Sequence, residues 1–201
     1  KERIHGDGIV YDINSPEALD EIFFNNKEEF LKKELLNYIQ LILISQNKIK
    51  YLSKNNLSYK RIDLIQSILP NSLFLIPIRE PLQHSYSLLN QHLHFTKLHK
   101  EDDFIRRYMN YLFHNEFGLD HKPWNNPMLF NNLNNINYWL EQWILFYEFI
   151  YKNFQFYKNC YFVIYEELSN PDYIKKILKK INLKNDKIID SEFFINSNKK
   201  D

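Results

Sequence analysis

Short apolar runs alternate with longer amphipathic stretches along this chain, and the alternation predicts an α/β fold. The segments "LFLIPI" (73–78) and "CYFVIY" (160–165) are almost wholly apolar and lie between turn-forming residues, a pattern typical of strands buried on both faces. The segment "IKYLSK" (49–54) is predicted as another short strand. Because long helical stretches separate these runs, we expect a parallel sheet flanked by helices.

Helical periodicity occupies most of the rest of the chain. Ser15 and Pro16 have the residue types of an N-cap and a first helical position, so a helix is predicted within 14–24. No repeat or low-complexity linker interrupts the pattern, so we expect a single domain over residues 1–201. Further helices are predicted at 28–46, 59–69, 81–97, 102–115 and 134–157, and from Pro171 onward.

The positions of apolar residues predict which face of each helix packs inward. On the helix over 134–157, Trp139 and Trp143 are predicted to point into the core. Gly118 is predicted to end the helix over 102–115. The helix that Pro81 opens carries an apolar stripe formed by Leu82, Tyr86, Leu89 and Leu93.

Composition narrows the classes of function. With 201 residues, 44% of them hydrophobic, the chain can bury one sizeable core, and its net charge of +1 argues against a nucleic-acid partner. The single cysteine, Cys160, excludes an internal disulfide, and no cluster of ligand side chains has convincing spacing, so we expect no metal. The longest apolar run, 38–44, is too short to span a membrane, and no secretory signal is visible, so we expect a cytoplasmic location.

A polar junction follows the first of the two long apolar runs. Arg79 directly follows 73–78, and Pro81 opens the next helix. Ligands of open α/β sheets bind beyond the carboxyl ends of strands, where a helix N-terminus offers N–H groups and a positive dipole end to an anion. Ser87 lies about 9 Å along that helix, within reach of a phosphate held by Arg79. The spacing leaves two interpretations open: a phosphate site, or an arginine paired with a surface acid beside a solvated serine.

The segment "IREPLQHSYS" resembles the stretch with which sulfotransferases bind the 3'-phosphate of the sulfate donor PAPS. In that family an arginine ends a strand and is followed by an acid or asparagine, a proline, and a serine at a fixed offset. Arg79, Glu80, Pro81 and Ser87 match in type and spacing, whereas Ser85 has the wrong offset. Other stretches up to about residue 168, among them "YLSKNN", "DDFIRRYMNYLFHNEFGLDHKPW" and "VIYEEL", are similar to a bacterial branch of P-loop sulfotransferases.

The resemblance implies a P-loop-NTPase-like fold and transfer of a sulfonate from PAPS to an acceptor hydroxyl or amine. Arg79 and Ser87 would then contact the donor, and Lys54 matches a lysine that the family places near the donor sulfonate or leaving group. Where cytosolic relatives have a histidine base, this chain has Asn56, which cannot accept a proton at neutral pH. The candidates for the base are His114 and Glu116, at a helix end that the resemblance marks, with a helix cap and a surface acid as the alternative. His92, on the helix of Ser87, is a weaker candidate, with a structural role as the alternative.

The family's loop for the 5'-phosphosulfate has no counterpart in this chain, which contains three glycines. We therefore expect that loop to lie before Lys1, the fold to be incomplete at the N-terminus, and these 201 residues alone to have negligible activity. The acceptor is expected to be a small molecule, a glycan or a lipid, which the sequence does not distinguish.

Two other functions compete with sulfotransfer. One is a non-catalytic interaction domain that keeps the sulfotransferase fold, and the upstream sequence would discriminate it from the enzyme. The other is a P-loop nucleotide kinase, which the spacing of Arg79 and Ser87 and the lack of an aspartate pair for magnesium both disfavour.

Overall fold

The computed structural model describes residues 28–126 and 129–183, which form a mixed α/β structure that is mostly helical. The helix predicted within 14–24 lies outside the described residues. The described chain groups into two compact units. One contains Glu28–Ser58 and Tyr111–Phe113, and the other contains Tyr59–Asn110 and the chain from His114 onward. All the strands and most of the helices described below belong to the second unit.

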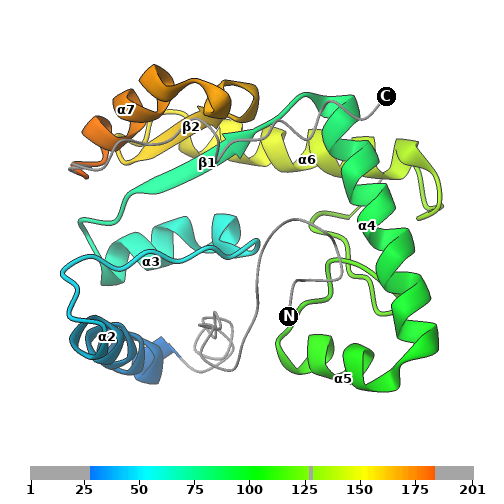
Figure 1. The fold of residues 1–201 in the computed structure, drawn as a ribbon, viewed down its shortest axis with the longest axis horizontal. Helices are drawn as coiled ribbons and strands as arrows, with labels where there is room; N and C mark the ends of the chain where they lie inside the picture. Colours follow the sequence, from blue (N-terminus) through cyan, green and yellow to red (C-terminus); the bar gives the residue numbers. More distant parts are fainter. Residues whose placement is uncertain (1–27, 127–128, 184–201) are drawn as a thin grey trace. The chain divides into compact units, whose positions relative to one another are not determined.

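The order of elements confirms most of the predicted helices and both long apolar strands. The predicted strand at 49–54 is wrong, because the segment between α2 and η1 is irregular. Its apolar side chains Ile49 and Leu52 are 93% and 88% exposed, so these two side chains do not anchor the run to a core that would hold it extended. In chain order the elements are α2 (Glu28–Ser45), the 3-10 helix η1 (Ser58–Arg61), α3 (Ile62–Ile68), β1 (Phe74–Ile78), α4 (Pro81–Glu101), α5 (Asp103–Tyr111), α6 (Ile136–Phe154), β2 (Cys160–Ile164), the 3-10 helix η2 (Tyr165–Ser169) and α7 (Pro171–Lys180) (Figure 1).

Asparagine side chains cap the starts of α6 and α7. The Asn135 side chain accepts a hydrogen bond from the Asn137 N–H (2.9 Å) and starts α6. Asn170 caps α7 in the same way, accepting from the Asp172 N–H (3.0 Å), with Pro171 at the first helical position. These local signals explain why sequence patterns located both helix starts closely.

The sheet consists, in the described chain, of two parallel strands. β1 and β2 pair from Phe74 with Cys160 to Ile78 with Ile164, so their carboxyl ends lie at the same edge (Figure 1). The prediction that both strands are buried on both faces is wrong. Ile76 is buried, whereas the neighbouring Leu75 is 39% exposed. In β2 the buried residue is Val163, on the opposite face, and Phe162, the partner of Ile76, is 41% exposed, so neither face of the two-stranded sheet is fully covered.

The core of the second unit is organised around α6. Its C-terminal half packs against α3 and β1 in a cluster containing Tyr59, Ile62, Ile76, Ile150 and Phe154. Its N-terminal half packs against α4 in a second cluster containing Leu88, Phe117, Tyr138 and Trp139. Trp139 is fully buried, as predicted, whereas Trp143 is only partly buried.

The buried face of α4 is not the one that its apolar stripe predicts. Leu82, Tyr86 and Leu93 are exposed, at 57%, 59% and 43%. The side that packs inward is more polar, because it meets both α6 and a loop whose backbone N–H groups need acceptors. The buried residues of α4 are Ser85, Leu88, His92 and His99.

None of the helices in residues 28–126 and 129–183 is both long and apolar enough to cross a membrane.

Candidate functional site

The parallel register brings together the residues that follow the two strands. Because Ile78 pairs with Ile164, Arg79 and Tyr165 emerge side by side at the carboxyl edge of the sheet. The guanidinium carbon of Arg79 lies 4.7 Å from the centroid of the Tyr165 ring, a cation–π contact. This contact orients the planar guanidinium at the edge where α/β proteins bind ligands.

The first turn of α4 differs from the expectation of unsatisfied N–H groups at this edge. The Glu80 carboxylate accepts hydrogen bonds from the N–H groups of Leu82 (3.1 Å) and Gln83 (2.6 Å), and Pro81 has no N–H. The Glu80 N–H donates in turn to Glu166 Oε1 (2.8 Å). The expectation of free N–H groups at the start of α4 is therefore wrong, and an anion here must be bound by side chains.

A histidine and an acid that sequence reasoning missed also lie at this junction. Burial lowers the pKa of His84, the positive charge of Arg79 lowers it further, and Glu166 partly offsets both effects. His84 is therefore neutral at pH 7. The signal that could have located Glu166 is the parallel pairing itself, since polar residues directly follow both strands.

The two serines of the motif lie in different environments. Ser85 is fully buried on the inner side of α4, whereas Ser87 is exposed. Ser87 is thus the serine that a ligand from solvent can reach without rearrangement of the helix. Arg79 is partly buried at the start of the same segment.

Lys54 and Asn56 lie in the other compact unit from Arg79 and Ser87. Both are exposed, in the irregular segment between α2 and η1. Lys54 on the one hand, and Arg79 and Ser87 on the other, are therefore each described within their own unit.

His114 and Glu116 are brought together just after α5. The helix ends at Tyr111, a few residues before the predicted end at 115, and His114 Nδ1 lies 3.7 Å from Glu116 Oε2. The His114 side chain is 47% exposed, whereas that of Glu116 is 9% exposed. A solvent-accessible imidazole beside a buried carboxylate can accept a proton and have the resulting charge stabilised.

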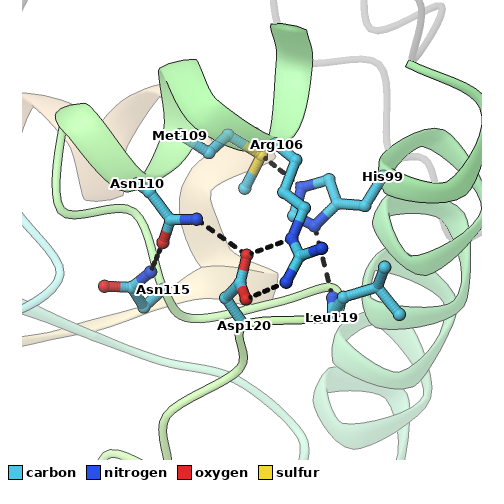
Figure 2. Close-up of polar contacts among 7 residues, drawn as sticks. All are labelled: His99, Arg106, Met109, Asn110, Asn115, Leu119 and Asp120. Carbon is cyan, nitrogen blue, oxygen red and sulfur yellow. Dashed lines mark hydrogen bonds and ion pairs between the residues drawn. The ribbon is translucent and has the colours of Figure 1, made fainter. Parts of the chain in front are cut away.

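Glu116 belongs to a loop, residues 115–121, that polar side chains of α4 and α5 hold in place. Figure 2 shows the contacts of Asp120, which receives two hydrogen bonds from Arg106 (2.7 and 2.6 Å) and one from Asn110 (2.7 Å). The Arg106 hydrogen bond is the largest cause that holds the pKa of Asp120 well below its usual range, followed by that of Asn110. Asn115 donates to Asn110 and continues the network.

Three buried or partly buried histidines complete the support of this loop. His92 Nδ1 accepts from the Gly118 N–H (3.3 Å), and His99 Nδ1 accepts from the Leu119 N–H (3.2 Å). His121 Nδ1 lies 2.6 Å from the Glu116 carbonyl oxygen, and its Nε2 lies 2.7 Å from the Tyr138 hydroxyl. Gly118 is therefore not the residue that ends α5. It lies in the loop with a φ of +84°, against the His99 ring.

Among residues 28–126 and 129–183, no group of three or more His, Cys, Asp or Glu side chains is placed to hold a metal ion. Comparisons with protein-family models, curated protein sequences and solved structures found no match to this chain.

Proposed function

We propose that this chain is part of a sulfotransferase that uses PAPS, and that Arg79 and Ser87 contact the 3'-phosphate of the donor. The observation that carries the proposal is the position of Arg79. It directly follows β1, at the edge where both parallel strands end, and it precedes a helix on which Ser87 is exposed. The resemblance of this segment to sulfotransferases is the reason for proposing the 3'-phosphate of PAPS as the group that is bound. A P-loop-NTPase-like sheet, larger than the described pair of strands, is part of the proposal.

The proposed reaction transfers a sulfonate from PAPS to a hydroxyl or amine of a small molecule, glycan or lipid. The S–O bond to the phosphate of the nucleotide breaks, a bond from sulfur to the acceptor atom forms, and the acceptor loses a proton. Lys54 is proposed to stabilise the negative charge on the leaving nucleotide. His114, with Glu116 beside it at 3.7 Å, is proposed to take the acceptor's proton.

The first prediction tests the 3'-phosphate contact. Arg79→Ala is expected to weaken binding of 3',5'-ADP about 30-fold, or about 2 kcal/mol, because it removes a charge-assisted hydrogen bond. Binding of 5'-AMP, which lacks the 3'-phosphate, is expected to change little. Both ligands can be titrated against the 201-residue chain by NMR, which measures weak dissociation constants.

Arg107→Ala is the matched control, because Arg107 is an exposed arginine that pairs with Asp103 on α5. It is expected to leave both affinities unchanged. If Arg79→Ala weakens 3',5'-ADP and 5'-AMP equally, or weakens neither, Arg79 does not bind the 3'-phosphate.

A second prediction concerns the acids beside Arg79. Glu166→Gln is expected to tighten 3',5'-ADP binding about threefold, because the amide oxygen can still accept from the Glu80 N–H while one negative charge is removed. Glu167→Gln, which removes the same charge from the next residue of η2, is the control and is expected to have a smaller effect. Equal effects in the two variants would show a general change in surface charge and no local one.

A non-catalytic domain of the same fold is the second candidate. The carboxylates of Glu80 and Glu166, which take up the first N–H groups at this edge, favour it. Under this alternative the chain shows no preference for 3',5'-ADP over 5'-AMP, so the same titrations decide between the two.

A further inference from the structure

The loop 115–121 is attached to α4 by two histidines used in the same unusual way. His92 and His99 lie two helical turns apart on the buried face of α4, where they are 3% and 5% exposed. Each accepts, through Nδ1, the N–H of one of two consecutive loop residues, Gly118 and Leu119. The second of these contacts is visible in Figure 2.

The contacts determine where each ring carries its proton. A nitrogen that accepts a hydrogen bond from a backbone N–H is unprotonated, so both rings are neutral and carry hydrogen on Nε2. The Nε2 atom of His99 lies 3.1 Å from Met109 Sδ, which accepts weakly, and that of His92 lies 3.5 Å from Thr96 Oγ1. Both partners are compatible with an Nε2–H donor.

A close steric fit makes the His99 contact hard to replace. A Cβ added at Gly118 would come closer than 3.0 Å to the His99 ring, which shows that the ring lies directly against the loop backbone. A ring held this closely cannot turn toward another hydrogen-bond donor without moving the loop.

We propose that His92 and His99 form a pH-sensitive clamp on the loop 115–121, closed while both rings are neutral and opened when either ring takes a second proton. A second proton converts Nδ1 from an acceptor into a donor. That N–H then faces the N–H of Gly118 or Leu119, so a hydrogen bond is replaced by repulsion between two donors. The clamp goes beyond the proposed function and does not depend on it.

The groups around His92 favour its neutral form and so the closed state. The His92 ring faces the ring of His121 from the loop, with centroids 5.5 Å apart, and the ring of Trp139 from α6, with centroids 5.3 Å apart. His121 itself hydrogen-bonds the Glu116 carbonyl and the Tyr138 hydroxyl, which is un-ionised because burial raises its pKa to about 12. Burial, with a smaller effect of His121, lowers the pKa of His92 to about 4.

His99 faces one charge of each sign. Burial lowers its pKa, Asp120 of the loop raises it, and Arg106 of α5 lowers it. Because Arg106 and Asp120 are bonded to each other, their effects on His99 largely offset. The Glu116 carboxylate, on the same loop, lies beside His114.

The direction of the pH dependence follows from these shifts. A histidine whose pKa is lower in the folded chain than its ordinary 6.5 stabilises the folded state fully above pH 6.5. That contribution is lost as the pH falls from 6.5 toward the folded value of about 4. Asp120, whose pKa is lowered below its usual 3.8, stays ionised across this window and does not account for the loss.

When the clamp opens, Phe117, whose buried side chain anchors the loop, is expected to leave its packed position. Phe117 is buried at 7% against Leu88, Tyr138 and Trp139, and it lies between Glu116 and the clamped Gly118. Where the proposed function also holds, opening separates Glu116 from His114 and lowers activity in acid.

Amide hydrogen exchange followed by NMR tests the clamp directly. The protection factors of the Gly118 and Leu119 amides are expected to fall by about tenfold or more between about pH 7 and about pH 4.5. The Ile150 amide, in the middle of α6, is expected to keep its protection and so exclude global unfolding. Unchanged protection of both loop amides over this range would overturn the proposal.

Asparagine variants separate titration from packing. The side-chain oxygen of asparagine can stand near the position of Nδ1, so His99→Asn keeps an acceptor that does not titrate. Because His92 still titrates in this variant, the fall in protection of both loop amides between about pH 7 and about pH 4.5 is expected to be smaller than in the unmodified chain. His92→Asn is expected to reduce the fall in the same way, and a double variant that carries both substitutions is expected to abolish it. The reduced fall in either single variant tests the proposal if the double variant does not fold. The same pH dependence in these variants as in the unmodified chain would also overturn the proposal.

Discussion

Gly118→Ala is expected to lower the free energy of unfolding by about 3 kcal/mol. Two physical effects add. The backbone of Gly118 has a φ of +84°, which an alanine adopts only with strain, and the new Cβ would press into the His99 ring. Because this ring is rigid and buried, the loop must move to make room, and the hydrogen bond from the Leu119 N–H to His99 is weakened. Denaturant unfolding, followed by tryptophan fluorescence, measures the loss.

A double-mutant cycle with His99→Ala apportions this loss between the two effects. In the His99→Ala background the ring is absent, so Gly118→Ala is expected to cost only the backbone strain, about 1 kcal/mol. The difference from the single variant is the cost of the steric overlap. If Gly118→Ala costs the same in both backgrounds, the ring does not lie against the loop as the structure describes.

Gln142→Leu is expected to destabilise the chain by about 3 to 4 kcal/mol. Gln142 is fully buried on α6 and makes three hydrogen bonds to the backbone of a loop. Its side-chain oxygen accepts from the N–H groups of Trp124 (3.0 Å) and Asn125 (3.3 Å), and its amide donates to the Asn125 carbonyl (2.8 Å). Leucine fills a similar volume but leaves these backbone groups without their side-chain partner.

The matched control is Gln155→Leu, at the exposed C-terminal end of the same helix. It changes the same atoms in a solvated position and is expected to alter the free energy of unfolding by less than about 0.5 kcal/mol. Thermal and denaturant unfolding of the two variants should therefore differ clearly. A loss for Gln142→Leu no larger than that of the control would show that water satisfies the loop backbone in its place.

The segment around Arg79 shows what local patterns can and cannot predict. An apolar run that ends in arginine and is followed by proline predicted a strand and then a helix, and β1 and α4 confirm both. The expectation of free helix N–H groups was wrong because Glu80 caps the helix itself. The neighbours Tyr165 and Glu166 lie in η2, directly after β2 and more than 80 residues further along the chain, so only the register of the two strands brings them to Arg79.

The helix α4 shows the limit of hydrophobic patterns most clearly. Its start followed from Pro81, yet its leucine stripe is largely exposed and its histidines are buried. An apolar stripe is predicted from the apolar character of the side chains alone. The burial of His92 and His99 is stabilised instead by backbone N–H groups that need acceptors, and these groups lie on a loop 26 and 20 residues further along the chain, respectively.

The amino-acid sequence therefore specifies the elements that depend on neighbouring residues: the two apolar strands, the capped starts of α6 and α7, and an arginine at a strand end. Those features depend on backbone preferences and on periodicity, which act over a few residues. The inward face of α4, the irregular course of 49–54 and the partners of Arg79 and Gly118 depend on surfaces from distant segments. Burial and hydrogen-bond satisfaction are properties of the packed chain, so they arise only when those segments meet.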